Sequence, residues 1–275
     1  LADFQDPWTQ VDYYQLLHLT PWGDSRHRRM EQEAFQYADH ISIVSPTWKS
    51  DLERIGARNI TVIPWGFDPD DYSELPAPDG NTFSITHTGI LGYDRNPPAF
   101  FQALKQLCET EPGFRERLVL RIVGQVDRSV REAISEAGLE NLTRFAGSVS
   151  RLEALRFTAS STVLLLLLNR QPNARGRIPG KLFEYLAVRR PLIVLGPRDS
   201  DASRIAAETG AGQAFDYDDA ASIRSGLASL FRQFMAGKLQ APINSEIGEF
   251  SIDRLTGRVA SILDAIQNIA GKDEA

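Results

Sequence analysis

The sequence is poor in the features that would support a disulfide framework, a thiolate metal site or a membrane span. Its 275 residues include one cysteine, Cys108, which excludes a disulfide network and any site built from several thiolates. The longest apolar run, Val163–Leu168, is far too short to cross a bilayer and instead predicts a strand buried on both faces. The net charge is −6, which argues against general binding to nucleic acid.

Several other signals are missing. The sequence has no internal repeat and no signal peptide, so we expect a cytoplasmic protein. It begins without methionine and in the middle of what resembles a strand, so we expect a chain that lacks an initial segment. The four histidines show no spacing typical of metal ligands, and no metal or cofactor is expected.

Strand and helix signals alternate along the chain, which predicts an α/β fold with a doubly wound parallel sheet. Expected strands are 40–45, 59–64, 82–89, 118–124, 142–147, 162–168, 192–195 and 213–216. Local signals place helix starts at Ser45, at Asn96 and at the capping box formed by Ser150 and Glu153.

A Pro-, Gly- and Asp-rich stretch at 65–81 has no periodicity and predicts a linker. It separates residues 1–64, which read as the last part of one α/β domain, from a complete α/β domain at 82–245. Residues 246–275 contain a long terminal helix, expected at about 252–270, whose apolar positions run from Ile252 to Ile269.

One helix start, in GRIPGKLFEYLAVRRPLIVLG, carries a charged pair in an otherwise apolar pattern: Lys181 and Glu184. Between residues 170 and 198 there are seven arginines and lysines and one glutamate, a local charge of +7 − 1 = +6. Arginine, lysine and a helix N-terminus all favour phosphate. Diphosphate binding and a solvated basic surface are equally good interpretations of this charge when it is taken alone.

Glycines follow two of the expected strands. Gly89 and Gly92 flank the GILG turn, and Gly124 ends the strand at 118–124. Because the carboxyl ends of parallel strands meet at one edge of the sheet, these loops and the 169–181 loop are expected to form one rim, where ligands bind in such folds. The GILG turn is a weak phosphate-loop candidate, since glycines also simply make turns.

Four stretches together resemble glycosyltransferase family 4, the group 1 retaining enzymes with the GT-B fold. They are ADFQDPWT at 2–9, VIPWGFD at 62–68, THTGILGYDRNP at 86–97 and GKLFEYLAVRRPLIVLG at 180–196. The resemblance implies two facing Rossmann-like domains, with residues 82–245 binding a nucleotide-sugar donor. Residues 1–64 would be the remainder of the acceptor domain, and the terminal helix would cross back onto it.

The resemblance also implies residue roles. Glu184 matches the second glutamate of the family's E-x7-E motif, which holds the donor ribose, while the first glutamate is replaced by Gly176. Lys181 and Leu182 would bind the donor, and Lys181 with Arg95 would hold its diphosphate.

On the acceptor side, Asp6 stands where other members carry a catalytic histidine, and Trp8 would face the same cleft. Asp6 as a simple turn residue is an almost equal alternative. His87, at the end of a strand, is more simply explained as a structural histidine than as a donor contact.

The expected function is transfer of a sugar from a nucleotide diphosphate sugar to an unidentified hydroxyl acceptor, with retention and without a metal, in polysaccharide or glycoconjugate synthesis. A nucleotide-sugar epimerase of the same fold and a non-catalytic sugar-nucleotide-binding module remain open as alternatives. Peripheral membrane contact, at the inner face of the membrane, would come from the missing N-terminal part.

Overall fold

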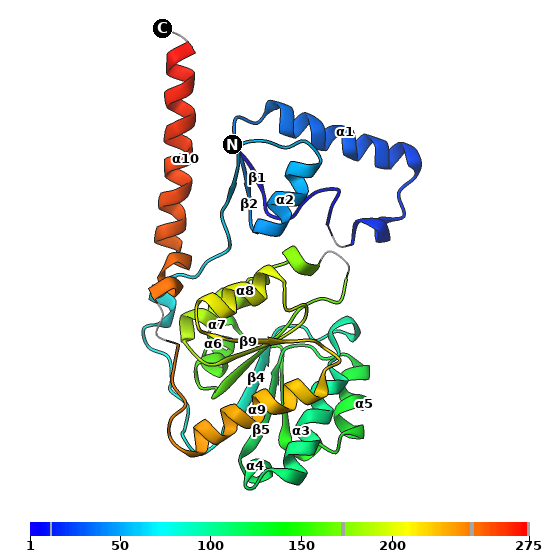
Figure 1. The fold of residues 1–275 in the computed structure, drawn as a ribbon, viewed down its shortest axis with the longest axis vertical. Coiled ribbons are helices and arrows are strands. Elements are labelled where there is room, and N and C mark those ends of the chain that lie inside the picture. Colours follow the sequence, from blue (N-terminus) through cyan, green and yellow to red (C-terminus); the bar gives the residue numbers. More distant parts are fainter. Residues whose placement is uncertain (12, 172–173, 243–244, 274–275) are drawn as a thin grey trace.

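The computed structural model describes the chain except residues 12, 172–173, 243–244 and 274–275, and its strands form two parallel sheets. The smaller sheet has the order β1-β2-β3, from strands Ala2–Phe4, Ile41–Ile43 and Ile60–Val62. Helix α1 (Pro21–Tyr37) connects β1 to β2, and α2 (Pro46–Arg54) connects β2 to β3. This sheet with its helices, called the first unit below, lies above the larger sheet in Figure 1.

The larger sheet has six parallel strands in the order β6-β5-β4-β7-β8-β9 and belongs to what we call the second unit. Its strands are β4 (Phe83–Thr88), β5 (Leu118–Val123), β6 (Thr143–Gly147), β7 (Val163–Leu167), β8 (Leu192–Leu195) and β9 (Gly212–Phe215). The chain leaves β4 toward one edge of the sheet and returns to fill the other edge from β7 onward. The predicted doubly wound parallel sheet is therefore confirmed.

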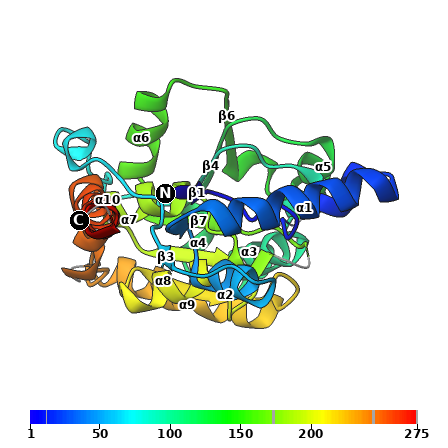
Figure 2. The ribbon, with the colours of Figure 1, turned by 90° about the horizontal axis from the view of Figure 1, so that it is seen from above.

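Helices cover both faces of the larger sheet (Figures 1 and 2). They are α3 (Pro98–Thr110), α4 (Phe114–Arg117), α5 (Arg128–Glu136), α6 (Arg151–Ala159), α7 (Lys181–Val188), α8 (Asp201–Glu208) and α9 (Ala220–Met235). Short 3-10 turns are η1 (Tyr14–Leu17), η2 (Pro69–Tyr72), η3 (Tyr93–Arg95), η4 (Glu140–Leu142), η5 (Ala174–Gly176) and η6 (Ser245–Phe250).

Helix starts follow the predicted caps in two of three cases. The Ser45 side chain accepts from the backbone N–H of Trp48, and the capping box of Ser150 and Glu153 has both of its bonds. The prediction for Asn96 is wrong: α3 begins at Pro98, and the Asn96 amide instead donates to the carbonyl oxygen of Ser129, 3.1 Å away. That amide ties the loop after β4 to α5 rather than capping α3.

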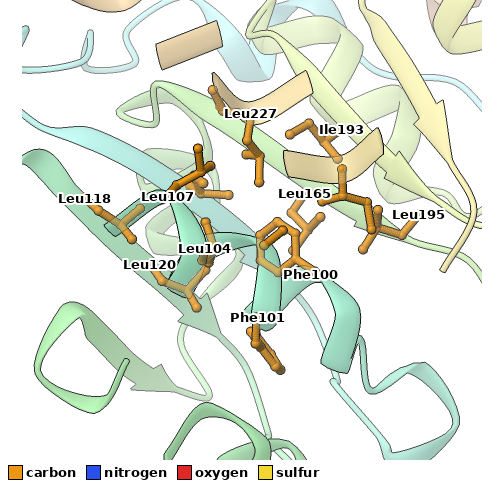
Figure 3. Close-up of a cluster of buried hydrophobic side chains, with 14 of the residues drawn as sticks. Phe100, Phe101, Leu104, Leu107, Leu118, Leu120, Leu165, Ile193, Leu195 and Leu227 are labelled. Atoms are coloured by element: carbon orange, nitrogen blue, oxygen red, sulfur yellow. The ribbon is translucent and has the colours of Figure 1, made fainter. Parts of the chain in front are cut away.

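The core of the second unit is split by the sheet into two apolar layers. Successive residues of β7 alternate between them: Leu165 and Leu167 face the α3 and α9 side, while Leu164 and Leu166 face the α7 and α8 side. Figure 3 shows the first layer, in which side chains from α3, α9, β5, β7 and β8 converge. A strand buried on both faces is what the unbroken apolar run at 163–168 predicts.

A linker and a long final helix flank the two units. Phe67 joins the linker to the start of α10 (Ile252–Asp273), with backbone bonds to Phe250 and Ile252 of 3.0 and 2.9 Å. Farther along, Arg258 donates to the carbonyl oxygen of Val62, and α10 then continues beside the first unit (Figure 1). Among the described residues, no helix is long and apolar enough to cross a membrane. The side chain of Ile269 lies outside the described part.

The boundaries expected for the four segments stay predictions. Of the expected apolar face of α10, Leu255 is buried at 6% exposure, whereas Ile252 is 50% and Leu263 is 44% exposed.

A cluster of buried aromatic rings packs under α9 in the second unit. Phe231 contacts Phe83 and Phe114 at ring-centroid distances of 5.3 and 4.9 Å, and all three side chains are at most 1% exposed. We expect Phe231→Ala to lower the free energy of unfolding by about 3–5 kcal/mol, because it leaves a cavity among rings that cannot collapse. Urea unfolding of this variant beside Phe145→Ala, a ring 36% exposed on β6, measures the difference. Equal losses in both would contradict this account of the core.

Candidate functional site

The candidate site lies at the carboxyl edge of the six-stranded sheet, around the end of β4. The loops after β4, β5 and β7 meet there, because these three strands are parallel neighbours. Between β4 and β7 the chain direction across the sheet reverses, and ligands of open α/β sheets bind at such a switch point. Residues 172–173 of the loop expected at this rim lie outside the described part of the chain.

Lys181, the first residue of α7, is the central charge at this edge. Its Nζ donates a hydrogen bond of 2.6 Å to the carbonyl oxygen of Thr88, the last residue of β4. Burial lowers the pKa of Lys181 to about 8, with a further lowering from Arg95 and an opposing effect of Glu184. An ammonium held in a desolvated position beside a second cation favours an anion as its missing partner.

Tyr185, one turn along α7, fixes the end of β4 against the helix. Its hydroxyl accepts from the backbone N–H of Thr88 at 2.9 Å and lies 3.0 Å from the Thr88 hydroxyl. Burial raises the pKa of Tyr185 to about 12, so the phenol remains a neutral hydrogen-bonding group. Helix α7 therefore carries Lys181 and also positions Thr88, whose carbonyl oxygen accepts the hydrogen bond from Lys181.

The glycines after β4 and β5 allow the two loops to approach closely. Gly89 and Gly124 have φ values of 108° and 131°, and a Cβ on Gly124 would overlap the carbonyl oxygen of Gly89. A Cβ on Gly89 would in turn overlap Lys181 Nζ. Only glycine meets both the backbone and the space requirement at these positions.

The GILG turn is not a simple phosphate loop. The N–H of Gly89 donates to Val123 at 2.7 Å, and the N–H of Leu91 donates to Gln125 at 2.9 Å. These two amides extend the pairing with β5 and are not directed at a ligand. Gly92 turns the chain into η3, where a Cβ would crowd the Asp94 carboxylate.

Arg95 and His87 lie close to Lys181. Arg95 Nε is buried without a hydrogen-bond partner in the described structure, and its nearest carboxylate is Asp94 at 3.5 Å. The buried ring of His87 is 3.0 Å from the carbonyl oxygen of Leu165 through Nδ1, which assigns the proton to Nδ1. Burial, together with the charge of Lys181, lowers the pKa of His87 to about 3. His87 is thus a neutral wall of the site.

Glu184 lies on α7 beside the linker. Burial raises its pKa, and the charges of Arg151 and Lys181 oppose that rise. Two linker residues complete the surroundings: Asp71 forms an ion pair of 2.6 Å with Arg151, and Tyr72 has a buried hydroxyl with no partner in the described structure. Burial, followed by the charge of Glu184, raises the pKa of Tyr72.

Arg151 and Tyr72 were not predicted from the sequence as residues of the site. An aromatic residue directly after the Asp- and Pro-rich run at 68–71 was the available signal for Tyr72. Nothing in the local sequence indicates that Arg151 reaches the linker.

Three arginines of the basic cluster at 170–198 form ion pairs in the structure, which the sequence did not predict. Arg170 forms a bidentate ion pair with Asp218, Arg175 lies 3.3 Å from Asp199, and Arg198 lies 3.8 and 3.5 Å from Asp216 and Asp219. Arg190 donates to the carbonyl oxygen of Ala159. Asp216, Asp218 and Asp219 belong to the β9–α9 loop, so part of the positive excess seen along the sequence is offset by acidic residues distant along the chain.

Among the described residues, no group of three or more His, Cys, Asp or Glu side chains is placed to hold a metal ion. Asp216 and Asp218 have Asp-x-Asp spacing, but each forms an ion pair with an arginine, Arg198 and Arg170 respectively.

Asp6 lies in the first unit, just after β1, in a hollow of about 440 Å³. Trp8, Tyr13, Tyr14 and His27 also line this hollow, and the rings of Trp8 and His27 are 5.9 Å apart. Asp6 is exposed and belongs to a different unit from Lys181. Its catalytic role stays a prediction.

Comparison with solved structures places this geometry in a known fold. The Anabaena protein HepE in complex with UDP has a TM-score of 0.67 and 17% identity over 90% of this chain and 70% of its own. A glycosyltransferase from Rickettsia africae has a TM-score of 0.67 and 16% identity over 90% and 68%. An E. coli trehalose-6-phosphate structure bound with UDP-2-fluoro glucose has a TM-score of 0.62 and 13% identity over 90% and 64%.

The chain has the GT-B fold. These likenesses are weak in sequence and concern the fold. No family profile matches the sequence, and a search of curated proteins found no significant match.

His87 makes the stability of the GT-B chain dependent on acid pH. Its folded pKa of about 3 lies below the model-peptide value of 6.5, so the unfolded state binds the extra proton between these values. Stability contributed by neutral His87 is complete above pH 6.5 and is lost as pH falls, by up to about 1.4 kcal/mol per pH unit.

His87→Gln should therefore flatten the decline of unfolding free energy between pH 6 and 4. His18→Asn is the control, because His18 is exposed and its left-handed backbone suits asparagine. An unchanged slope in His87→Gln would contradict a buried neutral His87.

Proposed function

We propose that this chain is a glycosyltransferase that binds a nucleotide diphosphate sugar at the carboxyl edge of its six-stranded sheet and transfers the sugar to a hydroxyl acceptor. The observation that carries the proposal is the pairing of Lys181 with Arg95. The charge of Arg95 acts on Lys181, Arg95 Nε has no hydrogen-bond partner and only a 3.5 Å ion pair with Asp94, and Lys181 Nζ is bound only to a neutral carbonyl in the contacts described. A diphosphate supplies the negative charge that this arrangement lacks.

In the proposed reaction, the bond between the sugar's anomeric carbon and the diphosphate oxygen breaks, and its electron pair remains on the diphosphate. Lys181 and Arg95 stabilise the charge that develops there, which lowers the barrier without a metal. The acceptor oxygen forms the new bond, and its proton passes to the departing diphosphate oxygen. Asp6 is the carboxylate we assign to the acceptor side, and it reaches the sugar when the two units enclose the substrates.

Glu184 is the residue we assign to the ribose. A carboxylate accepts hydrogen bonds from two neighbouring hydroxyl groups, and a partly buried position strengthens them. Similarity to structures that contain UDP, namely HepE and the trehalose-6-phosphate structure, supports a uridine or related nucleotide. Retention at the anomeric carbon, a role in polysaccharide synthesis and a cytoplasmic location, at the inner face of the membrane, rest on the family 4 resemblance and are proposed with it.

A non-catalytic sugar-nucleotide-binding module is the second candidate, and one observation favours it. Gly176 has no side chain where the family carries its first motif glutamate. The two candidates differ in turnover: both bind nucleoside diphosphate, but only the transferase releases it from a nucleotide sugar faster when an acceptor is added. Product analysis also separates transfer from epimerisation, which leaves the nucleotide attached to the altered sugar.

Lys181→Met should weaken UDP binding more than about tenfold, because it removes the charge and keeps most of the side-chain length. Calorimetric titration with UDP, without added metal, measures this. Lys105→Met on the exposed face of α3 is the matched control and should bind UDP as the parent does. Equal affinity of parent and Lys181→Met would overturn the assignment of Lys181 to the diphosphate.

A further inference from the structure

Helix α2 of the first unit docks directly onto the second unit near the candidate site. Figures 1 and 2 show α2 lying next to α8. The backbone N–H and hydroxyl of Thr47, in the first turn of α2, donate to the two carboxylate oxygens of Asp201 at 2.9 and 3.0 Å. Asp201 is 2% exposed and opens α8. One buried carboxylate therefore lies at the N-termini of two helices from different units, where both helix dipoles stabilise it.

Trp48, the next residue of α2, contacts the loop that leads to Lys181. A Cβ on Gly176 would overlap Cδ1 of the Trp48 indole. Gly176 is not among the glycines with left-handed backbone, so the ring, not the backbone conformation, is what excludes a side chain there. Trp48 is 1% exposed, and its Nε1 is buried without a hydrogen-bond partner in the described structure.

The contacted loop is short and runs straight into the anion site. Four residues separate Gly176 from Lys181, and Ile178 among them is 4% exposed in the core layer under α7. A shift of Gly176 therefore also moves the start of α7, because the segment between them is short and is held by the buried Ile178. The position of Lys181 depends on a contact made by the other unit.

We propose that Trp48 and Thr47 are positioning residues for the donor site: through Gly176 and Asp201 they hold loop 174–180 and so set Lys181 for the diphosphate. The docking of the first unit and the affinity for nucleoside diphosphate are then coupled. The glycine at position 176 is explained by the structure, because it leaves room for the indole ring of Trp48. The proposal deepens the proposed function and rests on it for the identity of the ligand.

A double-mutant cycle on Trp48 and Gly176 tests this coupling, with UDP as the probe and its dissociation constant as the readout. Gly176→Ala introduces a methyl group that pushes against the ring, and we expect UDP affinity to fall at least about fivefold. In the Trp48→Ala background the same methyl group meets no ring, so Gly176→Ala should cost nothing further. UDP contains no sugar beyond the ribose, so any contact of residue 176 with a transferred sugar does not enter the result.

Two results would overturn the proposal. One is an equal loss from Gly176→Ala in both backgrounds, which would make the effect local to the loop. The other is unchanged UDP affinity in Gly176→Ala and in Trp48→Ala. Because Trp48 also belongs to the core of the first unit, Trp48→Phe is included as a variant that keeps a ring there. It should bind UDP more tightly than Trp48→Ala.

A second readout works without ligand. After reductive methylation with carbon-13, NMR follows the titration of each lysine, and Lys181→Arg identifies the signal of Lys181. We expect Thr47→Val and Gly176→Ala to move the Lys181 midpoint from about 8 toward the ordinary value of 10.5, since a displaced lysine is better hydrated. Thr9→Val is the matched control, because Thr9 makes the same pair of bonds to buried Glu31 inside the first unit.

If the parent binds no UDP, the proposed function fails, and the Lys181 titration still decides the positioning role. A midpoint that stays the same in Thr47→Val, Gly176→Ala and Thr9→Val would overturn that role whatever the ligand is.

Discussion

The hydrogen bond from Lys181 Nζ to the carbonyl oxygen of Thr88 is the interaction on which the site depends. It holds an ammonium in a desolvated position beside Arg95. The charge of Glu184 only partly offsets the lowering of the Lys181 pKa by burial. Burial removes water from the ammonium group, which destabilises its charged form. A bound anion compensates for part of this lost hydration and so stabilises the arrangement. Tyr185 anchors Thr88 from the same helix, so donor and acceptor of this bond are positioned together.

Much of this frame follows from local sequence. Strand β7 lies in the centre of the sheet and is buried on both faces. This is why Val163–Leu168 is apolar without interruption. The helix start at Lys181 and the glycines Gly89 and Gly124 mark the rim, because parallel strands deliver their carboxyl ends to one edge. The roles given to Lys181 and Glu184 remain predictions, but the structure brings Lys181, Glu184 and the loop after β4 together.

What the sequence could not show depends on partners distant along the chain. The arginines at 170, 175 and 198 look like a phosphate surface until aspartates of the β9–α9 loop and Asp199 are placed against them. Trp48 and Gly176 are 128 positions apart, and no pattern around either one indicates their contact. Asn96 is not a cap, because α3 begins at Pro98 and the side-chain nitrogen of Asn96 instead donates to the distant Ser129. Local signals predict elements, whereas charge balance and docking are set by tertiary structure.

The most direct test of the account is a crystal structure of this chain grown with UDP and without metal. The account predicts diphosphate oxygens within hydrogen-bond distance of Lys181 Nζ and of the Arg95 guanidinium, with the ribose hydroxyls at Glu184. UDP bound elsewhere on the chain, or bound at this edge with Lys181 still directed only at Thr88, would contradict it.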